Sequence, residues 1–183
     1  IATESLAKLV KASPALLYKK EFAERISVGN FDDDLPKIKN TDWIIEVVVE
    51  RLDIKKSVYE KIEQFRKPGT LVSSNTSGIP INMLVEGRSD DFKKYFAGTH
   101  FFNPVRYLPL LEIIPTNDTD AEIVKFYMEY GAKFLGKTTV LAKDTPAFIA
   151  NRIGVFSMMN LLHEVKNLGL NVTDIDKLTG PVI

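Results

Sequence analysis

The stretch "AGTHFFNPVRYLPLLEIIP", residues 97–115, holds two apolar runs joined by a turn that contains Asn103 and Pro104. Each run carries one ionisable side chain, His100 in the first and Glu112 in the second. A carboxylate in the setting "LLEII" costs several kcal/mol of desolvation unless it is paired or neutralised. If the two runs are neighbouring strands, the imidazole supplies that partner. We therefore predict two buried strands, side by side, in which the ionisable residues His100 and Glu112 form a pair.

Such a pair has a chemical use. The carboxylate accepts a hydrogen bond from one ring nitrogen and fixes the tautomer, so the second nitrogen is set to exchange a proton near neutral pH. Two structural alternatives stay open at this point. The residues could form a buried pair without chemistry, or Glu112 could lie at a strand end and reach water.

Composition limits the function classes. The 183 residues suffice for one domain, or for one domain and a piece of another. A formal net charge of zero argues against nucleic-acid and membrane-surface partners. No apolar run approaches the roughly 18 residues that span a bilayer, and no cysteine is present, which fits a cytoplasmic protein. The start, "IATESLAKLVKAS", predicts an amphipathic helix rather than a signal peptide and has no initiator Met, so we expect a piece of a longer chain.

Strand and helix patterns alternate up to about residue 142. The run 41–50 is apolar enough for a strand buried on both faces, and apolar residues recur at helical spacing over 54–65. Short strands are predicted at 70–78 and 137–142, and a helix after a capping box of Thr119 and Glu122. This alternation predicts an α/β fold with helices on the faces of a sheet.

A different pattern begins near residue 144. Asp144 or Thr145 is the expected cap, and Pro146 the first turn, of a long helix that is apolar nearly all round. We predict two domains, an α/β domain over 1–143 and the beginning of a helical domain over 144–183.

Three further places carry groups suited to a ligand. "SNTSG", 74–78, follows a predicted strand, where ligands bind in open α/β sheets, although it also fits an ordinary turn. Glu50 ends the run 41–50 and Lys55 lies in the next helix, with a solvated junction as the alternative. Asn151 lies on the apolar helix and needs a partner, from backbone or ligand. The chain contains no G-x-G-x-x-G, no P-loop and no metal-ligand spacing.

Taken together and in order, these motifs resemble the NAD-dependent 3-hydroxyacyl-CoA dehydrogenases of fatty-acid β-oxidation. The matching strings are "VVE" with Lys55, "SNTSGIPI" at 74–81, "GTHFFNP" at 98–104, "LLEIIP" at 110–115 and "KDTPAFIANRIG" at 143–154. The resemblance is nearest to the dehydrogenase part of bacterial multifunctional proteins, in which a hydratase domain lies elsewhere in the polypeptide.

The resemblance implies a role for each catalytic candidate. His100 is expected to be the general base that takes the 3-hydroxyl proton, and Glu112 to orient it. Ser77 is expected near the substrate oxygen and the nicotinamide, and Asn151 to hold the substrate.

The same resemblance implies NAD as cofactor and acyl-CoA as substrate. The expected cofactor contacts are Val48, Val49, Glu50, Lys55, Ser77 and Asn103. It also implies a homo-oligomer or a place in a β-oxidation complex for the full-length protein.

The departure from the family is the missing glycine-rich fingerprint. The implied fold is a partial Rossmann-like, doubly wound sheet that lacks its first βαβ unit, followed by the start of an all-helical domain. We expect such a chain to bind NAD poorly. Two alternatives remain: a related dehydrogenase acting on a small hydroxy acid or polyol, and a catalytically silent scaffold segment.

Overall fold

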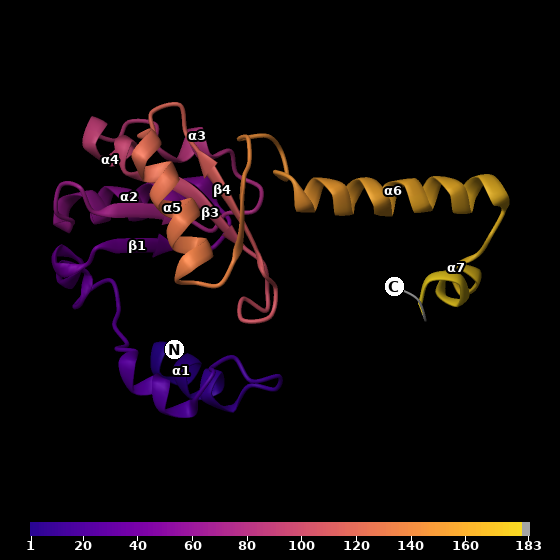
Figure 1. Ribbon diagram of the computed structural model, residues 1–183, viewed down its shortest axis with the longest axis horizontal. Coiled ribbons are helices and arrows are strands. Elements are labelled where there is room, and N and C mark those ends of the chain that lie inside the picture. The colour runs from indigo at the N-terminus through magenta and orange to yellow at the C-terminus, as the bar shows by residue number, and fades with distance from the viewer. Residues whose placement is uncertain (181–183) are drawn as a thin grey trace. The chain divides into compact units, whose positions relative to one another are not determined.

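The computed structural model describes residues 1–180 as two compact units, one covering Ile1–Pro146 and the other starting at Ala147. Figure 1 shows the elements in chain order along its colour bar. The helices and strands are α1 (Ala2–Lys11), η1 (Lys20–Arg25), η2 (Leu35–Asn40), β1 (Trp43–Glu46), α2 (Leu52–Phe65), β2 (Leu71–Ser74), α3 (Ile81–Leu84), α4 (Asp90–Lys94), β3 (Phe96–Phe101), β4 (Leu110–Pro115), α5 (Ala121–Lys133), β5 (Thr138–Leu141), α6 (Ala150–Leu168) and α7 (Val172–Thr179).

The first unit is built on one five-stranded sheet in the order β1-β2-β3-β4-β5. The pairs β1–β2, β2–β3 and β4–β5 are parallel, whereas β3 and β4 are antiparallel. This mostly parallel sheet with helical crossovers confirms the predicted α/β, Rossmann-like fold.

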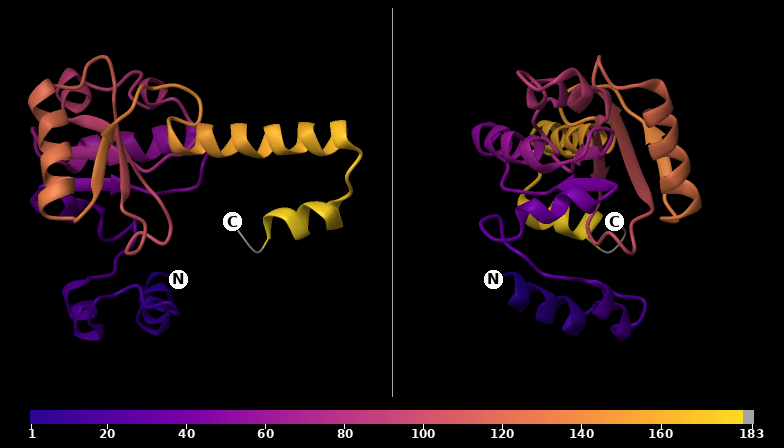
Figure 2. Two further views of the ribbon diagram at one scale, coloured as in Figure 1. Left: turned by 45° about the vertical axis from the view of Figure 1, so that its right-hand side comes forward. Right: turned by 90° about the vertical axis from the view of Figure 1, so that its left-hand side faces the viewer.

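The helices α2 and α5 lie on opposite faces of the sheet (Figure 2). On the α2 face, the buried ring of Tyr59 meets the ring of Phe96 with centroids 5.4 Å apart. On the α5 face, Tyr127 packs in one cluster with Leu111 and Ile113. Because side chains alternate along a strand, His100 and Glu112 fall on the α2 face together with Phe96.

The apolar run 41–50 is shorter as a strand than predicted. Only Trp43–Glu46 pairs with the sheet, and it does so at the edge. Ile45, Val47 and Val49 are exposed rather than buried on both faces. Burial on both faces requires elements packed over each face, and among residues 1–180 β1 is a strand at the edge of the sheet.

Two predicted helix starts are wrong in detail. The N-cap of α5 is Asp120, whose side chain accepts from the amide of Glu122 at 2.8 Å, whereas Thr119 donates to the carbonyl of Phe96. Asp144 does not cap the long helix α6, which starts at Ala150. Its carboxylate instead accepts from the amides at the start of α3, because those unpaired N–H groups lie within reach.

The segment before β1 contains α1 and two short 3₁₀ helices. Ile26 and Val28 follow η1 without regular structure. Arg106, from the loop after β3, donates to the carbonyls of Ala15 and Leu17 at 2.8 and 2.7 Å, so this segment is hydrogen-bonded to the loop between β3 and β4.

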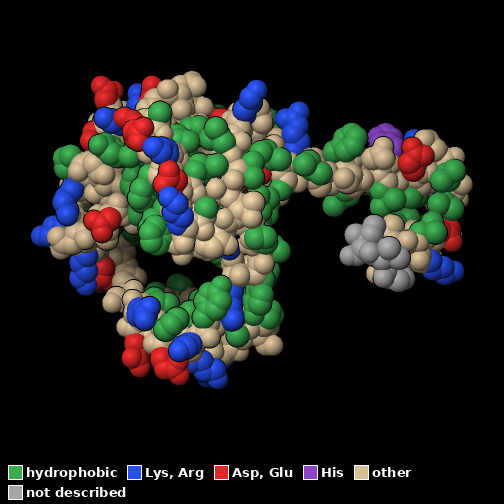
Figure 3. Space-filling model, in the orientation of Figure 1, with side chains coloured by type: hydrophobic (Ala, Val, Ile, Leu, Met, Phe, Trp, Pro, Cys, Tyr) green, Lys and Arg blue, Asp and Glu red, His purple; other side chains and the backbone are tan. Residues whose placement is uncertain are grey.

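In the second unit, α6 and α7 contain no buried residue. On the face drawn in Figure 3, positive and negative side chains are interspersed over the first unit, in keeping with a net charge of zero.

None of the helices within residues 1–180 combines the length and apolarity that a bilayer crossing requires.

Candidate active site

Polar side chains gather at one edge of the sheet, namely the edge formed by the carboxyl ends of its first three strands. The three parallel strands β1, β2 and β3 end there with Glu46, Ser74 and Phe101. The antiparallel strand β4 begins at the same edge, so Glu112 enters it beside the end of β3. Strand ends of this kind are where open α/β sheets bind ligands.

The two ionisable residues of the opening stretch form a buried pair. His100 and Glu112 are direct cross-strand partners, and Nδ1 of the imidazole lies 2.7 Å from Oε2 of the carboxylate. The two residues are 5% and 0% exposed. The ring of Phe102 packs against the imidazole, with centroids 4.5 Å apart. The predicted contact is therefore confirmed, and the alternative in which Glu112 reaches water is wrong.

This geometry fixes one nitrogen of the imidazole. A carboxylate acceptor on Nδ1 favours the tautomer with a proton on that atom and stabilises the ring when it becomes charged. The contact with Glu112 is therefore made by Nδ1, and the carboxylate orients the ring.

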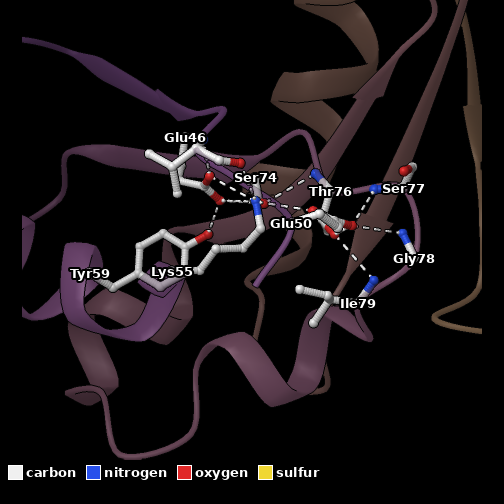
Figure 4. A network of polar contacts seen from close by, with 10 residues as sticks. Glu46, Glu50, Lys55, Tyr59, Ser74, Thr76, Ser77, Gly78 and Ile79 are labelled. Atoms are coloured by element: carbon white, nitrogen blue, oxygen red, sulfur yellow. Dashed lines mark hydrogen bonds and ion pairs between the residues drawn. The ribbon is translucent and has the colours of Figure 1, made fainter. Parts of the chain in front are cut away.

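Glu50 holds the loop after β2 (Figure 4). Its Oε1 accepts from the hydroxyl of Thr76 and from the amides of Ser77 and Gly78, the latter two at 3.1 Å each. Its Oε2 lies 3.3 Å from Nζ of Lys55. The loop that carries Ser77 is thus attached to the loop after β1.

The pKa of Glu50 reflects these contacts. Burial on its own would raise it, but the Thr76 hydrogen bond, the Lys55 charge and the backbone amides of Gly78 and Ser77 together hold the pKa below the ordinary value. Glu50 is therefore ionised at neutral pH, as an acceptor of several hydrogen bonds should be.

Lys55 is buried rather than extended toward solvent. Its Nζ donates to Glu46 Oε1 at 2.8 Å and to the carbonyl of Val48 at 3.3 Å, and the side chain is 1% exposed. Tyr59 also donates to Glu46, at 2.6 Å. Burial and the Glu46 carboxylate raise the pKa of the Tyr59 phenol, so it stays protonated and remains a donor.

Two residues that organise this edge were given no role of their own in the prediction, although Asn75 belongs to the stretch 74–78 that it included. Glu46 is the buried acceptor just described. The sequence feature that could have indicated it is a charged residue within the apolar run "WIIEVVV". Asn75 accepts from the amide of Phe101 at 2.8 Å and so joins the loop after β2 to the end of β3. The sequence feature that could have indicated Asn75 is its position as an amide side chain directly after a strand.

The remaining predicted residues divide between the two units. Ser77, Val49 and Asn103 are exposed in loops that follow β2, β1 and β3, and Val48 is half-buried. Asn151 belongs to the second unit, where it is the second residue of α6 and partly exposed.

The donor set of the first unit suits one half of a dinucleotide. The exposed Val49 offers an apolar surface, and Ser77 and Asn103 offer neutral polar groups, as a nicotinamide riboside requires. The glycine-rich turn that would hold a pyrophosphate is absent from the 183 residues. Within residues 1–180 no cluster of three or more histidine or acidic side chains is arranged to hold a metal ion.

Residues 2–145 match the family model described as "3-hydroxyacyl-CoA dehydrogenase, NAD binding domain". A probable 3-hydroxyacyl-CoA dehydrogenase from Bacillus subtilis is 50% identical over all 183 residues, which cover 23% of that protein. A putative fatty acid oxidation complex trifunctional enzyme from Rickettsia felis is 37% identical over 93% of the chain and 25% of its own length. The chain thus spans about a quarter of each of these relatives.

The fold is shared with solved structures. The crystal structure of (S)-3-hydroxybutyryl-CoA dehydrogenase from Ralstonia eutropha superposes with a TM-score of 0.69 at 30% identity, covering 92% of this chain and 58% of that one. The model match spans most of the chain and includes both members of the buried pair. The chain therefore belongs to the 3-hydroxyacyl-CoA dehydrogenase family, as a carrier of its NAD-binding domain.

Proposed function

We propose that this chain carries the proton-transfer site of an NAD-dependent dehydrogenase that oxidises (S)-3-hydroxyacyl-CoA to 3-oxoacyl-CoA in fatty-acid β-oxidation. The observation that supports this most directly is the buried contact of 2.7 Å between His100 and Glu112. A histidine in a strand, oriented by a fully buried carboxylate, has the arrangement of a general base.

The residues of this chain divide the work as follows. Nε2 of His100 takes the proton of the 3-hydroxyl while the C3–H bond breaks, so the C–O bond becomes a carbonyl. NAD, when bound, supplies the acceptor of the hydride from C3. Glu112 stabilises the positive charge that the imidazole gains in this step.

The other named residues bind and orient. Ser77, on the loop held by Glu50, hydrogen-bonds the substrate oxygen. Asn151, to which the resemblance gives a substrate contact, belongs to the second unit. Val48, Val49, Glu50, Lys55 and Asn103 lie toward the cofactor, Lys55 acting through its contact with Glu50. The full-length protein works as a homo-oligomer or within a complex, in the cytoplasm.

The test is turnover of the full-length protein with acetoacetyl-CoA and NADH, followed through the absorbance of NADH. Replacing the general base in His100→Ala is expected to lower kcat by about 10²-fold or more. His163→Ala is the matched control, because His163 is the other histidine and lies exposed on α6. It should retain the activity of the unmodified protein.

Two outcomes would contradict the proposal. Equal kcat for His100→Ala and the unmodified protein identifies a silent scaffold segment. Turnover of a small hydroxy acid or polyol, with none of acetoacetyl-CoA, identifies the related dehydrogenase class instead.

A further inference from the structure

The carboxylate of Glu46 is the most heavily hydrogen-bonded group at the site edge in Figure 4. Its Oε1 accepts from Nζ of Lys55 at 2.8 Å and from the amide of Val48 at 2.6 Å. Its Oε2 accepts from the hydroxyls of Tyr59 at 2.6 Å and Ser74 at 2.7 Å. The side chain is 0% exposed, and its contacts with Lys55, Tyr59 and Ser74 are buried.

An arrangement of this kind is more than the packing of strand β1 requires. A buried ion pair is no more stabilising than apolar side chains of similar volume, because both charges lose their hydration. What the pair Glu46–Lys55 provides is a fixed position for a charge. Here the fixed charge is the Lys55 ammonium, which lies 3.3 Å from Glu50.

From Glu46, two routes of contact lead to the loop after β2. The first passes through Lys55 to Glu50, whose Oε1 accepts from the amides of Ser77 and Gly78. The second passes through Ser74, whose hydroxyl donates to Glu46 and accepts from the amide of Thr76 at 3.2 Å. Both routes end on consecutive residues, 76 to 78, of the same loop.

We propose that Glu46 is a positioning residue: its buried carboxylate sets the backbone of residues 76–78, and thereby the place of the Ser77 hydroxyl, through Lys55–Glu50 and through Ser74. The inference rests on the proposed function, because it assigns Ser77 to the substrate oxygen. Glu46 itself touches neither substrate nor cofactor in this scheme.

The charge of Glu46 is what the scheme depends on. Glutamine has the same shape but only one acceptor oxygen, and its NH₂ group faces hydroxyl and ammonium donors. In Glu46→Gln the Lys55 ammonium loses its closest counter-charge and at least one hydroxyl loses its acceptor. The loop is then free to shift, and a displacement of about 1 Å at a reacting group lowers kcat by up to about 10²-fold.

The experiment is a double-mutant cycle on the full-length protein with Glu46→Gln and Ser77→Ala. Glu46→Gln alone is expected to lower kcat about 10-fold or more with a smaller change in KM. In the Ser77→Ala background the same substitution should change kcat less than about 2-fold, because the hydroxyl that it displaces is gone. Independent, multiplicative losses would overturn the proposal.

Hydrogen exchange provides a second measurement that does not depend on turnover. In Glu46→Gln the peptide that covers residues 75–80 should exchange faster, while peptides from α5 keep their rates. Unchanged exchange over 75–80 would overturn the proposal whatever the activity. If the unmodified protein does not turn over the acyl-CoA substrate, the proposed function fails, and hydrogen exchange still decides whether Glu46 sets the loop.

Asp91→Asn is the matched control, because Asp91 forms an ion pair with the buried Arg66 and contacts none of residues 74–78. Asp91→Asn should lower the stability of the protein. Its effect on kcat should be the same with and without Ser77→Ala, and amide hydrogen exchange over residues 75–80 should not become faster. If Glu46→Gln does not fold, Ser74→Ala replaces it, since this change removes only the second route. It should couple to Ser77→Ala in the same sense and to a smaller degree; additive losses would again overturn the proposal.

Discussion

At the scale of residues, the site is made of short polar contacts whose partners are far apart in the sequence. The pair His100–Glu112 joins positions 12 residues apart, and the bond from Thr76 to Glu50 joins positions 26 apart. The Glu112 carboxylate, which is 0% exposed, has lost its hydration and regains the energy only from its donors. The removal of one partner is therefore felt by the other.

Glu112→Gln tests the orienting role of the carboxylate. The amide keeps the shape of the side chain but not the charge that stabilises a protonated imidazole, so kcat should fall by about 10²-fold with the fold retained. Circular dichroism and steady-state kinetics on the full-length protein check both parts. Glu129→Gln is the control, because Glu129 pairs with Lys133 on the exposed face of α5. A Glu112→Gln enzyme with unchanged kcat would contradict the orienting role.

Glu50 predicts a pH dependence of the Ser77 loop. Its folded-state pKa is lowered, so the stabilisation it gives is fully present above the unfolded value and disappears as the pH falls through the lowered folded value. The amide NMR signals of Ser77 and Gly78 should stay constant at neutral pH and titrate with a midpoint below 4.5, the ordinary glutamate value. Glu50→Gln should abolish this titration, and a midpoint above 4.5 would show that the contacts do not hold the charge.

At the scale of elements, β3 shows how close packing brings the site together. Gly98 pairs with Ile114 of β4, and α3 lies against it: a Cβ added at residue 98 would lie 2.8 Å from Cδ1 of Ile81 and 3.1 Å from Cβ of Ile114. The same α3 receives the Asp144 carboxylate at its first amides. The missing side chain of Gly98 thus lets α3 approach the strand that carries His100.

Gly98→Ala is expected to destabilise the first unit by about 1–3 kcal/mol, because the added methyl overpacks a buried contact. Urea unfolding of the chain measures this change. Gly154→Ala is the control: Gly154 lies in α6 with no atom within 4 Å of an added Cβ, so alanine there should raise helix stability slightly. Equal stability of Gly98→Ala and the unmodified chain would show that α3 gives way without loss.

At the scale of the whole molecule, the chain consists of two units, and the sheet of the first has β1 at its edge. The strand-end groups suited to the nicotinamide half of NAD are present, but the sequence contains no glycine-rich turn for the pyrophosphate. Much of the affinity for a dinucleotide comes from those backbone amides. The chain should therefore have the proton-transfer residues without tight cofactor binding.

Calorimetric titration of the 183-residue chain with NADH is expected to show no micromolar binding. The full-length protein, titrated under the same conditions, is the control and should bind. Micromolar affinity of the chain alone would contradict this expectation and would mean that residues after β1 and β2 suffice for the cofactor.

The sequence by itself determined the α/β fold and the pairing of His100 with Glu112. Both follow from local pattern: strand and helix periods alternate, and two short runs joined by a turn each carry one group that needs a partner, which favours their pairing as neighbours. The motif strings around Ser77 and Asn151 were equally local, and the family match over residues 2–145, which includes Ser77, agrees with the resemblance.

Only the tertiary structure decided the partners of Glu46, Lys55 and Asp144. The sequence left Lys55 open as a cofactor contact or a solvated residue at a helix start, yet it is buried on Glu46. Asp144 was expected to cap the following helix, yet it caps α3 from 62 residues away. The exposure of Val47 and Val49 could not be predicted from the sequence either. The hydrogen-bond partner and the burial of a side chain depend on which strands and loops lie side by side. The residues that supply those partners and cover those faces are distant in the chain.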